Sequence, residues 1–347
     1  MMAEAVSPRF VRSEPRTVLR PVSVAPMMDW TDRHYRYFMR RITRRVLLYT
    51  EMVTTGAIIF GDRDHLLGFD EEEHPLSLQI GGDDPDACAR SVRIAEDYGY
   101  DEYDLNVGCP SDRVQDGAFG ACLMAKPETV ARIVGAMKQV TDTPVTVKHR
   151  IGIDGREDYE DLAEFVSRVS EAGADRFIVH ARIAVLEGLS PKENRNVPPL
   201  RYEDVYRLKR EFPQLPIEIN GHVDSIESIH AHLQKLDGAM IGRAAYDRPY
   251  FLATADRAFY GSTTPVPTRR EVLAAMVPYV ERVVAAGRRP RAVYRHMLGL
   301  FASQPGARRY RRVLSDPRVD EADVAGVLEE AVSAVPQEVL DARGTDG

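Results

Sequence analysis

The stretch Asp104-Leu105-Asn106-Val107-Gly108-Cys109-Pro110 has the pattern of a short buried strand that runs into a loop. Its apolar residues recur at a period of two until the glycine breaks the alternation, and the proline stiffens the exit. The strand end thus presents the Cys109 thiol on a loop, three residues after the Asn106 amide. Most free cysteines are small buried hydrophobes, so this stretch alone favours a structural cysteine. The rest of the chain favours a chemical role.

Eight short segments of this kind recur along the chain, each rich in β-branched residues or leucine. Patterns of helical period separate most of them; two follow Pro85 and Pro127, and one ends at Gly173. This alternation predicts an α/β fold of the (β/α)8 TIM barrel class. The alternative is a doubly wound open sheet, but no Gly-x-Gly-x-x-Gly follows the first strand. The expected strands are 22–25, 46–49, 76–80, 102–107, 145–148, 177–180, 217–220 and 238–241, and the expected helices are 87–98, 129–140, 157–172, 205–212 and 225–236.

A change of composition separates the barrel from a helical tail. The stretch Gly261-Ser262-Thr263-Thr264-Pro265-Val266-Pro267 is typical of a linker, and Thr268-Arg269-Arg270-Glu271 is a capping box that opens a helix. Beyond it, apolar residues recur at helical spacing and no strand pattern appears. We therefore expect a flexible N-terminal tail at 1–20, a catalytic barrel at 21–260, a linker at 261–267 and a small C-terminal helical domain at 268–347.

Composition indicates a globular protein of the cytoplasm. The chain has 347 residues, 44% of them hydrophobic and 29% charged, and its three cysteines are odd in number and widely spaced. A disulfide framework or a thiolate zinc site is therefore not expected, and a reducing compartment fits best. The first twenty residues lack the apolar segment of a signal peptide, and no run of about 18 apolar residues predicts a membrane span. We expect a cytoplasmic protein that is a monomer and binds no membrane.

Arginines concentrate in two parts of a chain whose net charge is −7. Charge runs are usually solvated faces, but clusters interleaved with aromatic residues in an acidic protein indicate a local site for a polyanion. The first cluster comprises Arg33, Arg36, Arg40, Arg41, Arg44 and Arg45, with Tyr35, Tyr37 and Phe38 among them; the second comprises Arg288, Arg289, Arg291, Arg295, Arg308, Arg309, Arg311 and Arg312.

Polar or reactive residues stand at most of the expected strand ends, where barrels of this class build their active sites. Any one of them alone is more often a solvated loop residue, but their convergence indicates a functional mouth. The last two ends follow strands seven and eight, the usual phosphate site of these barrels; the alternative is two turn glycines, and the phosphate site is the favoured interpretation. Lys148 would place a positive charge in the mouth, which favours an anionic ring. Together with the phosphate site, it indicates a phosphorylated planar cofactor. The sequence shows no histidine, aspartate and glutamate residues at the spacing of a metal site. The residues at these ends are Ala25-Pro26-Met27-Met28, Gln79, Asn106 to Cys109, Lys148, His180 with Arg182, Asn220-Gly221-His222 and Gly242-Arg243.

Three longer stretches surround these strand ends: 25–33 (Ala-Pro-Met-Met-Asp-Trp-Thr-Asp-Arg), 105–111 (Leu-Asn-Val-Gly-Cys-Pro-Ser) and 147–152 (Val-Lys-His-Arg-Ile-Gly). They resemble motifs of the tRNA-dihydrouridine synthases. Residues 180–182, 188–195 and 304–309 resemble the A-type branch, which modifies positions 20 and 20a of the tRNA D-loop. The likeness runs from about Val22 to Leu314. It implies a barrel that carries FMN, a helical tRNA-binding domain and NADPH as the reductant.

The resemblance also implies roles for individual residues. One departure is His222, which stands where the family commonly has a second glycine and puts backbone contact to the phosphate there in doubt. Pro26, Met27 and Met28 line the flavin, Gln79 faces its ring edge, Lys148 and His180 contact the isoalloxazine, and Asn220, Gly221, His222, Gly242 and Arg243 lie on the FMN phosphate segment. Cys109 matches the proton donor, Asn106, Lys192, Arg195 and Arg309 match tRNA-contacting positions, and Arg182 reads the flipped uracil.

The residue types agree with that chemistry. Reduced flavin would deliver a hydride to carbon 6 of uracil, and a thiol with a pKa of about 8.5 is mainly protonated at neutral pH, so Cys109 can supply the proton to carbon 5. Two alternatives remain: an FMN barrel that acts on a free small molecule, and an RNA-binding module that performs no redox chemistry. The arginine-rich tail argues against the first, and colourless protein that gains no flavin would favour the second.

Overall fold

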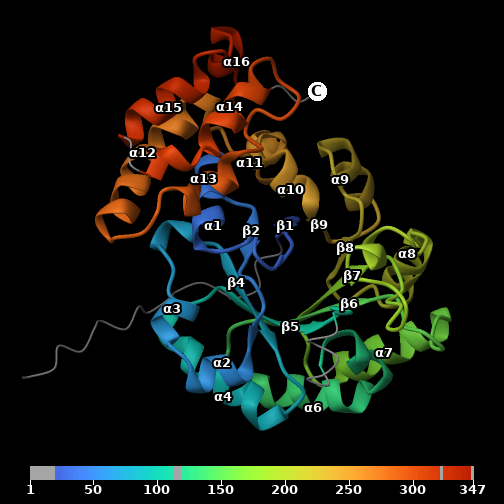
Figure 1. Cartoon of the computed structure of the whole chain (residues 1–347). Helices are drawn as coiled ribbons and strands as arrows, with labels where there is room; N and C mark the ends of the chain where they lie inside the picture. Colours follow the sequence, from blue (N-terminus) through green and yellow to red (C-terminus); the bar gives the residue numbers. More distant parts are fainter. Residues whose placement is uncertain (1–19, 112–118, 321–322, 345–347) are drawn as a thin grey trace, which may run out of the picture.

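A closed barrel of parallel strands organises the chain (Figure 1). The computed structural model describes residues 20–111, 119–320 and 323–344. In it β2 pairs with β1 on one side and with β4 on the other, which closes the sheet, and β3 continues the line of β2 along β4. Each of the eight expected segments is a strand, so the (β/α)8 barrel is confirmed. The strands are β1 (Val22–Val24), β2 (Leu47–Tyr49), β3 (Val53–Thr54), β4 (Leu76–Gly81), β5 (Glu102–Val107), β6 (Val145–Arg150), β7 (Arg176–His180), β8 (Ile217–Asn220) and β9 (Gly238–Ile241).

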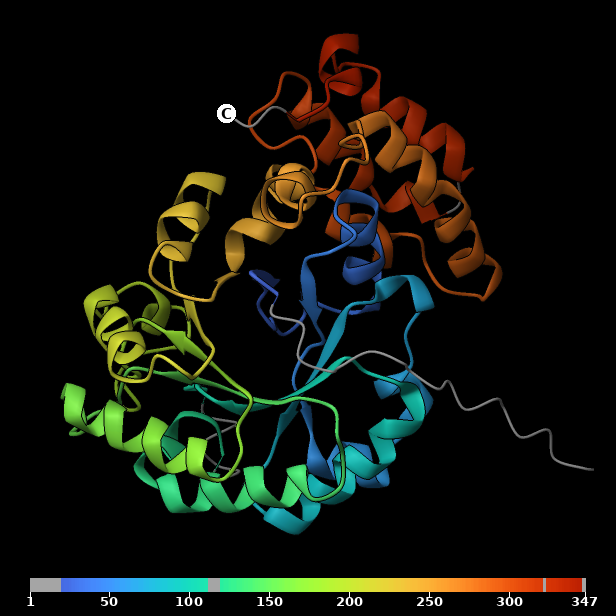
Figure 2. The ribbon, with the colours of Figure 1, turned by 180° about the vertical axis from the view of Figure 1, so that it is seen from behind.

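Helices cover the outside of the barrel, and the main apolar core lies between them and the strands (Figure 2). Their local start and stop signals are the expected ones: Pro85 and Pro127 stand at first turns, and Gly173 follows its helix with a φ of +99°. All five expected helices are present, with ends shifted by a few residues. The helices of this part are α1 (Arg33–Ile42), α2 (Thr55–Phe60), α3 (Arg63–Leu67), α4 (Pro85–Ala95), α6 (Pro127–Lys138), α7 (Tyr159–Glu171), α8 (Tyr202–Glu211), α9 (Ile226–Leu233), α10 (Arg243–Asp247) and α11 (Ala255–Tyr260), with short 3-10 turns at Glu71–Glu73, Glu96–Tyr98, Gly120–Ala125, Glu193–Arg195 and Pro249–Thr254.

Helices alone follow the barrel in the described residues from 261 onward, and they pack over α1 (Figure 1). The predicted capping box is present: the Thr268 hydroxyl accepts from the Glu271 N–H at 3.1 Å, and the Glu271 carboxylate accepts from the Thr268 N–H at 2.8 Å. No helix of the described ranges has the length and apolar character needed to cross a membrane. These helices are α12 (Arg269–Ala285), which continues through Pro278, α13 (Arg291–Met297), α14 (Ala307–Leu314), α15 (Val324–Val332) and α16 (Gln337–Asp341), with a 3-10 turn at Pro317–Asp320.

The floor of the barrel is charged. Arg176 Nη2 lies 2.6 Å from Glu102 Oε2, and Arg176 Nε lies 3.6 Å from Glu218 Oε2. The Tyr49 hydroxyl donates to Glu102 at 2.8 Å, and the Ser23 hydroxyl donates to Glu218. All five side chains are buried. Ala25, Leu47, Ile178 and Met240 form a small separate apolar cluster with Tyr49 inside the barrel.

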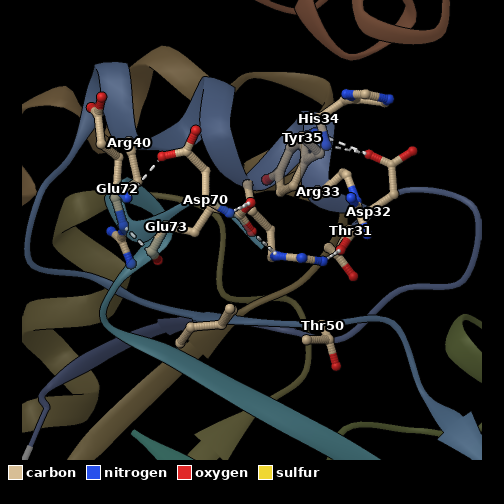
Figure 3. A network of polar contacts seen from close by, with 12 residues as sticks. Thr31, Asp32, Arg33, His34, Tyr35, Arg40, Thr50, Asp70, Glu72 and Glu73 are labelled. Carbon is tan, nitrogen blue, oxygen red and sulfur yellow. Dashed lines mark hydrogen bonds and ion pairs between the residues drawn. The ribbon is translucent and has the colours of Figure 1, made fainter. Parts of the chain in front are cut away.

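The first arginine cluster is part of the framework, which corrects the expectation of a polyanion site there (Figure 3). Arg36 Nε lies 2.6 Å from Glu73 Oε2, and both side chains are buried. Arg40, also buried, donates to the carbonyl oxygens of Glu73 at 3.0 Å and of Pro75 at 2.7 Å. The arginines of α1 therefore satisfy the turn that precedes β4, and the sequence alone did not reveal these acceptors. Only Arg44 and Arg45 of the cluster are exposed.

Replacing Arg176 tests the charged floor. Arg176→Met keeps the side-chain volume but leaves Glu102 and Glu218 buried without their cation, so we expect the free energy of unfolding to fall by about 3–5 kcal/mol. Urea unfolding followed by circular dichroism measures it. The control is Arg168→Met on α7, whose partner Glu128 lies 2.7 Å away in an exposed pair, and which should change stability by less than about 1 kcal/mol. Equal losses in the two variants would contradict this account.

Candidate active site at the mouth of the barrel

The carboxyl ends of five neighbouring strands carry polar side chains that converge inside the barrel. Strand register sets Asn106 of β5 beside Lys148 of β6, and His180 of β7 beside Asn220 of β8. Gln79 completes the set from β4. The Lys148 ammonium donates to Asn220 Oδ1 at 3.3 Å, reaching across β7. Closure of the sheet therefore brings these polar strand-end side chains together at one mouth, as expected.

The Cys109 thiol lies on the loop that follows β5, half-buried at this mouth. Asn106 Oδ1 accepts from the backbone N–H groups of Gly108 at 3.1 Å and of Cys109 at 3.0 Å. The Cys109 carbonyl accepts from the Ala121 N–H at 2.9 Å. The Cys109 Sγ atom lies 3.4 Å from Ser111 Oγ. The loop is thus anchored on both sides of the half-buried Cys109.

Positive charge dominates the mouth. Burial lowers the pKa of Lys148, against the opposing effect of Asp104. Burial, followed by the charges of Arg150 and Lys148, holds the pKa of His180 well below its ordinary value, so its imidazole is neutral at neutral pH. His180 Nδ1 is buried and has no hydrogen-bond partner among the described residues. The site therefore offers cations and an unpaired imidazole nitrogen to an anionic polar ligand.

Arg150 is a site residue that the sequence analysis missed. Its Nε donates to the carbonyl oxygen of Gly108 at 3.0 Å, and its Nη1 donates to those of Ile183 and Asn194, each at 2.9 Å. One buried guanidinium thereby joins the Cys109 loop to the loop that follows β7. The available signal was its position two residues after Lys148, because alternate residues of a strand point to the same face.

The segment after β8 keeps a left-handed backbone. Gly221 has a φ of +121° and His222 a φ of +55°. His222 therefore adopts the conformation that favours the glycine common in the resembling family, so the departure changes the side chain and preserves the turn. A Cβ on Gly221 would lie 3.0 Å from the Leu200 side chain. Turns of this kind present backbone N–H groups to anions. Arg243 follows the next strand, β9, as the first residue of α10, and its guanidinium donates to Asn196 Oδ1 at 2.8 Å.

The loop after β1, which contains Pro26, Met27 and Met28, is tied to the helical tail. Trp30 stacks on Tyr246 with ring centroids 4.4 Å apart and an angle of 15° between the planes. Asp32 caps α1 by accepting from the N–H groups of its first turn. The same carboxylate lies 2.6 Å from Arg295 Nη2 and 3.0 Å from His296 Nε2, both on α13. Met28 remains 55% exposed beside this junction.

The remaining expected residues divide into two places. Arg182, Lys192 and Arg195 belong to the loop after β7, where Arg182 Nη1 donates to the Pro198 carbonyl and Lys192 and Arg195 are exposed. Although Arg195 is solvent-exposed, partial desolvation by its neighbours, followed by the charge of Arg243, lowers the pKa of its guanidinium. Arg309 stands apart on α14, with Nη2 3.6 Å from Glu330 Oε1. In the described ranges no group of three or more histidine, cysteine or acidic residues has the arrangement of a metal site.

The chain is a (β/α)8 barrel whose cationic mouth is its candidate active site. A model of the dihydrouridine synthase family matches residues 23–338. The chain belongs to that family, whose members are flavin-dependent oxidoreductases that modify tRNA. The resemblance found in the motifs is thereby confirmed.

Similar proteins support this membership along almost the whole chain. A protein of Synechocystis sp. is 59% identical over 298 residues, covering 86% of this chain and 89% of its own length. One of Vibrio parahaemolyticus is 55% identical over 319 residues, covering 92% and 98%. Both carry the name tRNA-dihydrouridine(20/20a) synthase. A solved 2-naphthoyl-CoA reductase complex is 11% identical with a TM-score of 0.53, covers 71% of this chain and 50% of its own, and shows the likeness of fold alone.

Removing the charge of Asp32 tests the junction with the tail. Its hydrogen bonds to His296 and Arg295 hold the pKa of Asp32 below its ordinary value, against the opposing effect of burial. Asp32→Asn keeps a good helix cap but loses the charge, so we expect the free energy of unfolding to fall by about 1–2 kcal/mol at pH 7. Because the folded-state pKa is depressed, the difference should be constant down to about pH 5 and shrink below about pH 4.

The control for this comparison is Asp84→Asn. Asp84 caps α4 by accepting from the Ala87 N–H at 2.7 Å and forms no ion pair in the described part of the chain. We expect it to leave stability nearly unchanged across the same pH range, because asparagine and aspartate cap helices about equally well. A loss in Asp84→Asn equal to that in Asp32→Asn would remove the role assigned to the charge.

Proposed function

We propose that this protein reduces the uracil 5,6 double bond of uridines at positions 20 and 20a of the tRNA D-loop to dihydrouridine. FMN is its bound cofactor and NADPH its transient reductant, and it acts as a monomer in the cytoplasm, where tRNA is found. The observation that carries the proposal is the Cys109 thiol, held by Asn106 at the mouth where Lys148 and His180 converge. The names of the similar proteins support the two tRNA positions.

The residues at the mouth suit both the ring and the phosphate of FMN. The unpaired buried His180 Nδ1 and the Lys148 ammonium offer hydrogen bonds to the polar edge of an isoalloxazine. We assign the phosphate to the turn at Gly221 and to the Arg243 guanidinium. Pro26, Met27 and Met28 line one side, Gln79 faces the ring edge, and Asn220, His222 and Gly242 complete the pocket.

Cys109 supplies the proton in this proposal. The chemistry that bound reduced flavin contributes is a hydride for carbon 6 of uracil. The thiol then transfers its proton to carbon 5, which completes the addition and leaves a thiolate for solvent to reprotonate. Arg150 and Arg195 are the cations that interact electrostatically with the Cys109 side chain.

The target uridine must leave its stack to reach the mouth, so contacts to RNA should surround it. We assign Arg182 to the extruded uracil and Asn106, Lys192 and Arg195 to the adjoining nucleotides. Residues 268–347 form the tRNA-binding domain, with Arg309 among its contacts. Support comes from the exposed arginines of this part, since phosphate contacts supply much of the affinity for RNA. Those of the second arginine cluster are Arg288, Arg289, Arg295, Arg308, Arg311 and Arg312.

Mapping dihydrouridine in tRNA after incubation with the protein and NADPH tests the function. We expect the wild type, yellow with bound FMN, to convert positions 20 and 20a. Cys109→Ala should retain flavin and tRNA affinity but turn over about 10²–10⁴ times more slowly, which is the usual contribution of a general acid. Full turnover by this variant would remove the assignment of Cys109. Colourless wild type that gains no flavin would reject the function itself.

Reversing two charges on α14 tests the tRNA-binding domain. Arg308→Glu with Arg309→Glu should weaken tRNA binding, leave NADPH oxidation unchanged, and reduce the slope of log affinity against log salt by about one to two. Fluorescence anisotropy of labelled tRNA at several salt concentrations measures the tRNA affinity and its salt dependence. The matched control is Arg90→Glu with Arg93→Glu, which makes the same charge change on the exposed face of α4, away from the tail (Figure 1). Equal weakening by both pairs would show a general charge effect.

A further inference from the structure

Three buried side chains form a hydrogen-bonded chain from within the barrel to the Cys109 loop. Asp104 Oδ2 accepts from Gln79 Nε2 at 2.7 Å, and Gln79 Oε1 accepts from Asn106 Nδ2 at 2.9 Å. Asn106 Oδ1 then accepts from the N–H groups of Gly108 and Cys109. Asp104, Gln79 and Asn106 are all less than 10% exposed. Strand register places Gln79 directly beside Asp104.

The direction of this chain is set at both of its ends. Backbone N–H groups can only donate, so Asn106 must turn its oxygen toward the loop and its NH2 group toward Gln79. An ionised carboxylate can only accept, so Asp104 draws the NH2 group of Gln79 and leaves the Gln79 oxygen for Asn106. With the Gln79 amide reversed, two NH2 groups would face each other, and a buried pair of that kind lacks the hydrogen bonds that offset its desolvation.

We propose that Asp104 is a positioning residue, whose acceptor oxygen orients the Gln79 and Asn106 amides and thereby fixes the loop that carries Cys109. The consequence for turnover rests on the function proposed above, whereas the orientation of the loop does not. Asp104 has no contact with the thiol and acts through the two amides between them.

To orient Gln79, residue 104 needs a hydrogen-bond acceptor only at the position of Asp104 Oδ2. Asp104 Oδ1 accepts from the Thr146 hydroxyl at 2.9 Å, and that hydroxyl also lies 3.1 Å from Glu102 Oε1. Burial raises the pKa of Asp104, but a proton on Oδ1 would face Thr146 and leave Oδ2 free to accept from Gln79. By the same geometry an asparagine can direct its NH2 group to Thr146 and its oxygen to Gln79. Asp104→Asn should therefore preserve the chain, and Asp104→Leu should break it.

Alkylation of Cys109 by iodoacetamide reports the state of the loop without any need for turnover. Mass spectrometry resolves the Cys109 peptide from that of Cys122, which is also half-buried and serves as the control within each sample. We expect Cys109 to react at least about threefold faster in Asp104→Leu, because a loop that has lost its hydrogen-bonded support opens more often. The rates in Asp104→Asn and in Thr146→Val should equal that of the wild type, since both variants keep an acceptor for Gln79.

A second variant that interrupts the hydrogen-bonded series keeps the test decisive if Asp104→Leu does not fold. Gln79→Met interrupts the next link and should give the same increase in Cys109 reactivity. Asp104→Leu combined with Gln79→Met should be no more reactive than either alone, because interactions that act in series are not additive. An unchanged Cys109 rate in whichever single variant folds, an Asp104→Asn variant as reactive as Asp104→Leu, or additive effects would each overturn the proposal.

Turnover of the holoenzyme separates this proposal from the proposed function. With tRNA and NADPH, Asp104→Leu should lower kcat by about tenfold or more, because it displaces the loop that carries the reacting thiol. Asp104→Asn should restore kcat. Wild type that forms no dihydrouridine rejects the proposed function, and the alkylation rates then still decide the role of Asp104.

Discussion

A buried polar side chain inside a closed barrel loses its contacts with water, so it is stable there chiefly when another group of the barrel interior pairs with it. The charged floor meets this constraint through Arg176, which lies between Glu102 and Glu218. Alternate residues of a strand share a face, so Glu102, Asp104 and Asn106 form a polar column on β5 from floor to mouth. The same packing that stabilises the interior therefore also delivers oriented amides to the loop that carries the thiol.

The helical tail and the active-site mouth share structural elements. Asp32 begins α1 and holds Arg295 and His296 of α13, while Trp30, two residues earlier, stacks on Tyr246 of α10. The loop with Met27 and Met28 is thus held between the barrel and the tail. Asp32 makes the direct link to the tail, whereas Trp30 ties the same loop to α10 of the barrel.

Much of the architecture could be predicted because it follows from local pattern. Periods of two and of 3.6 residues marked the strands and most helices, and the polar strand ends marked the mouth. The prediction for the first arginine cluster was wrong, because the sequence does not show whether an arginine faces solvent or a buried acceptor. Arg36 and Arg40 have the composition of a surface cluster, yet they are buried against Glu73 and the carbonyls of the turn before β4. Asp104 and Arg150 were overlooked for the converse reason, since the partner of Asp104 lies on another strand and those of Arg150 lie on two loops far apart in the chain.

The sequence by itself determined the barrel, the order of its strands and the membership of a family, because periodicity, turn residues and long motifs are properties of consecutive residues. It also placed Cys109 on a loop at a strand end. Only the tertiary structure decided which arginines face solvent, how His222 preserves a glycine-like turn, and which carboxylate orients the amides next to the thiol. Those features depend on pairs of atoms far apart in the chain, whose meeting is set by strand register and barrel closure.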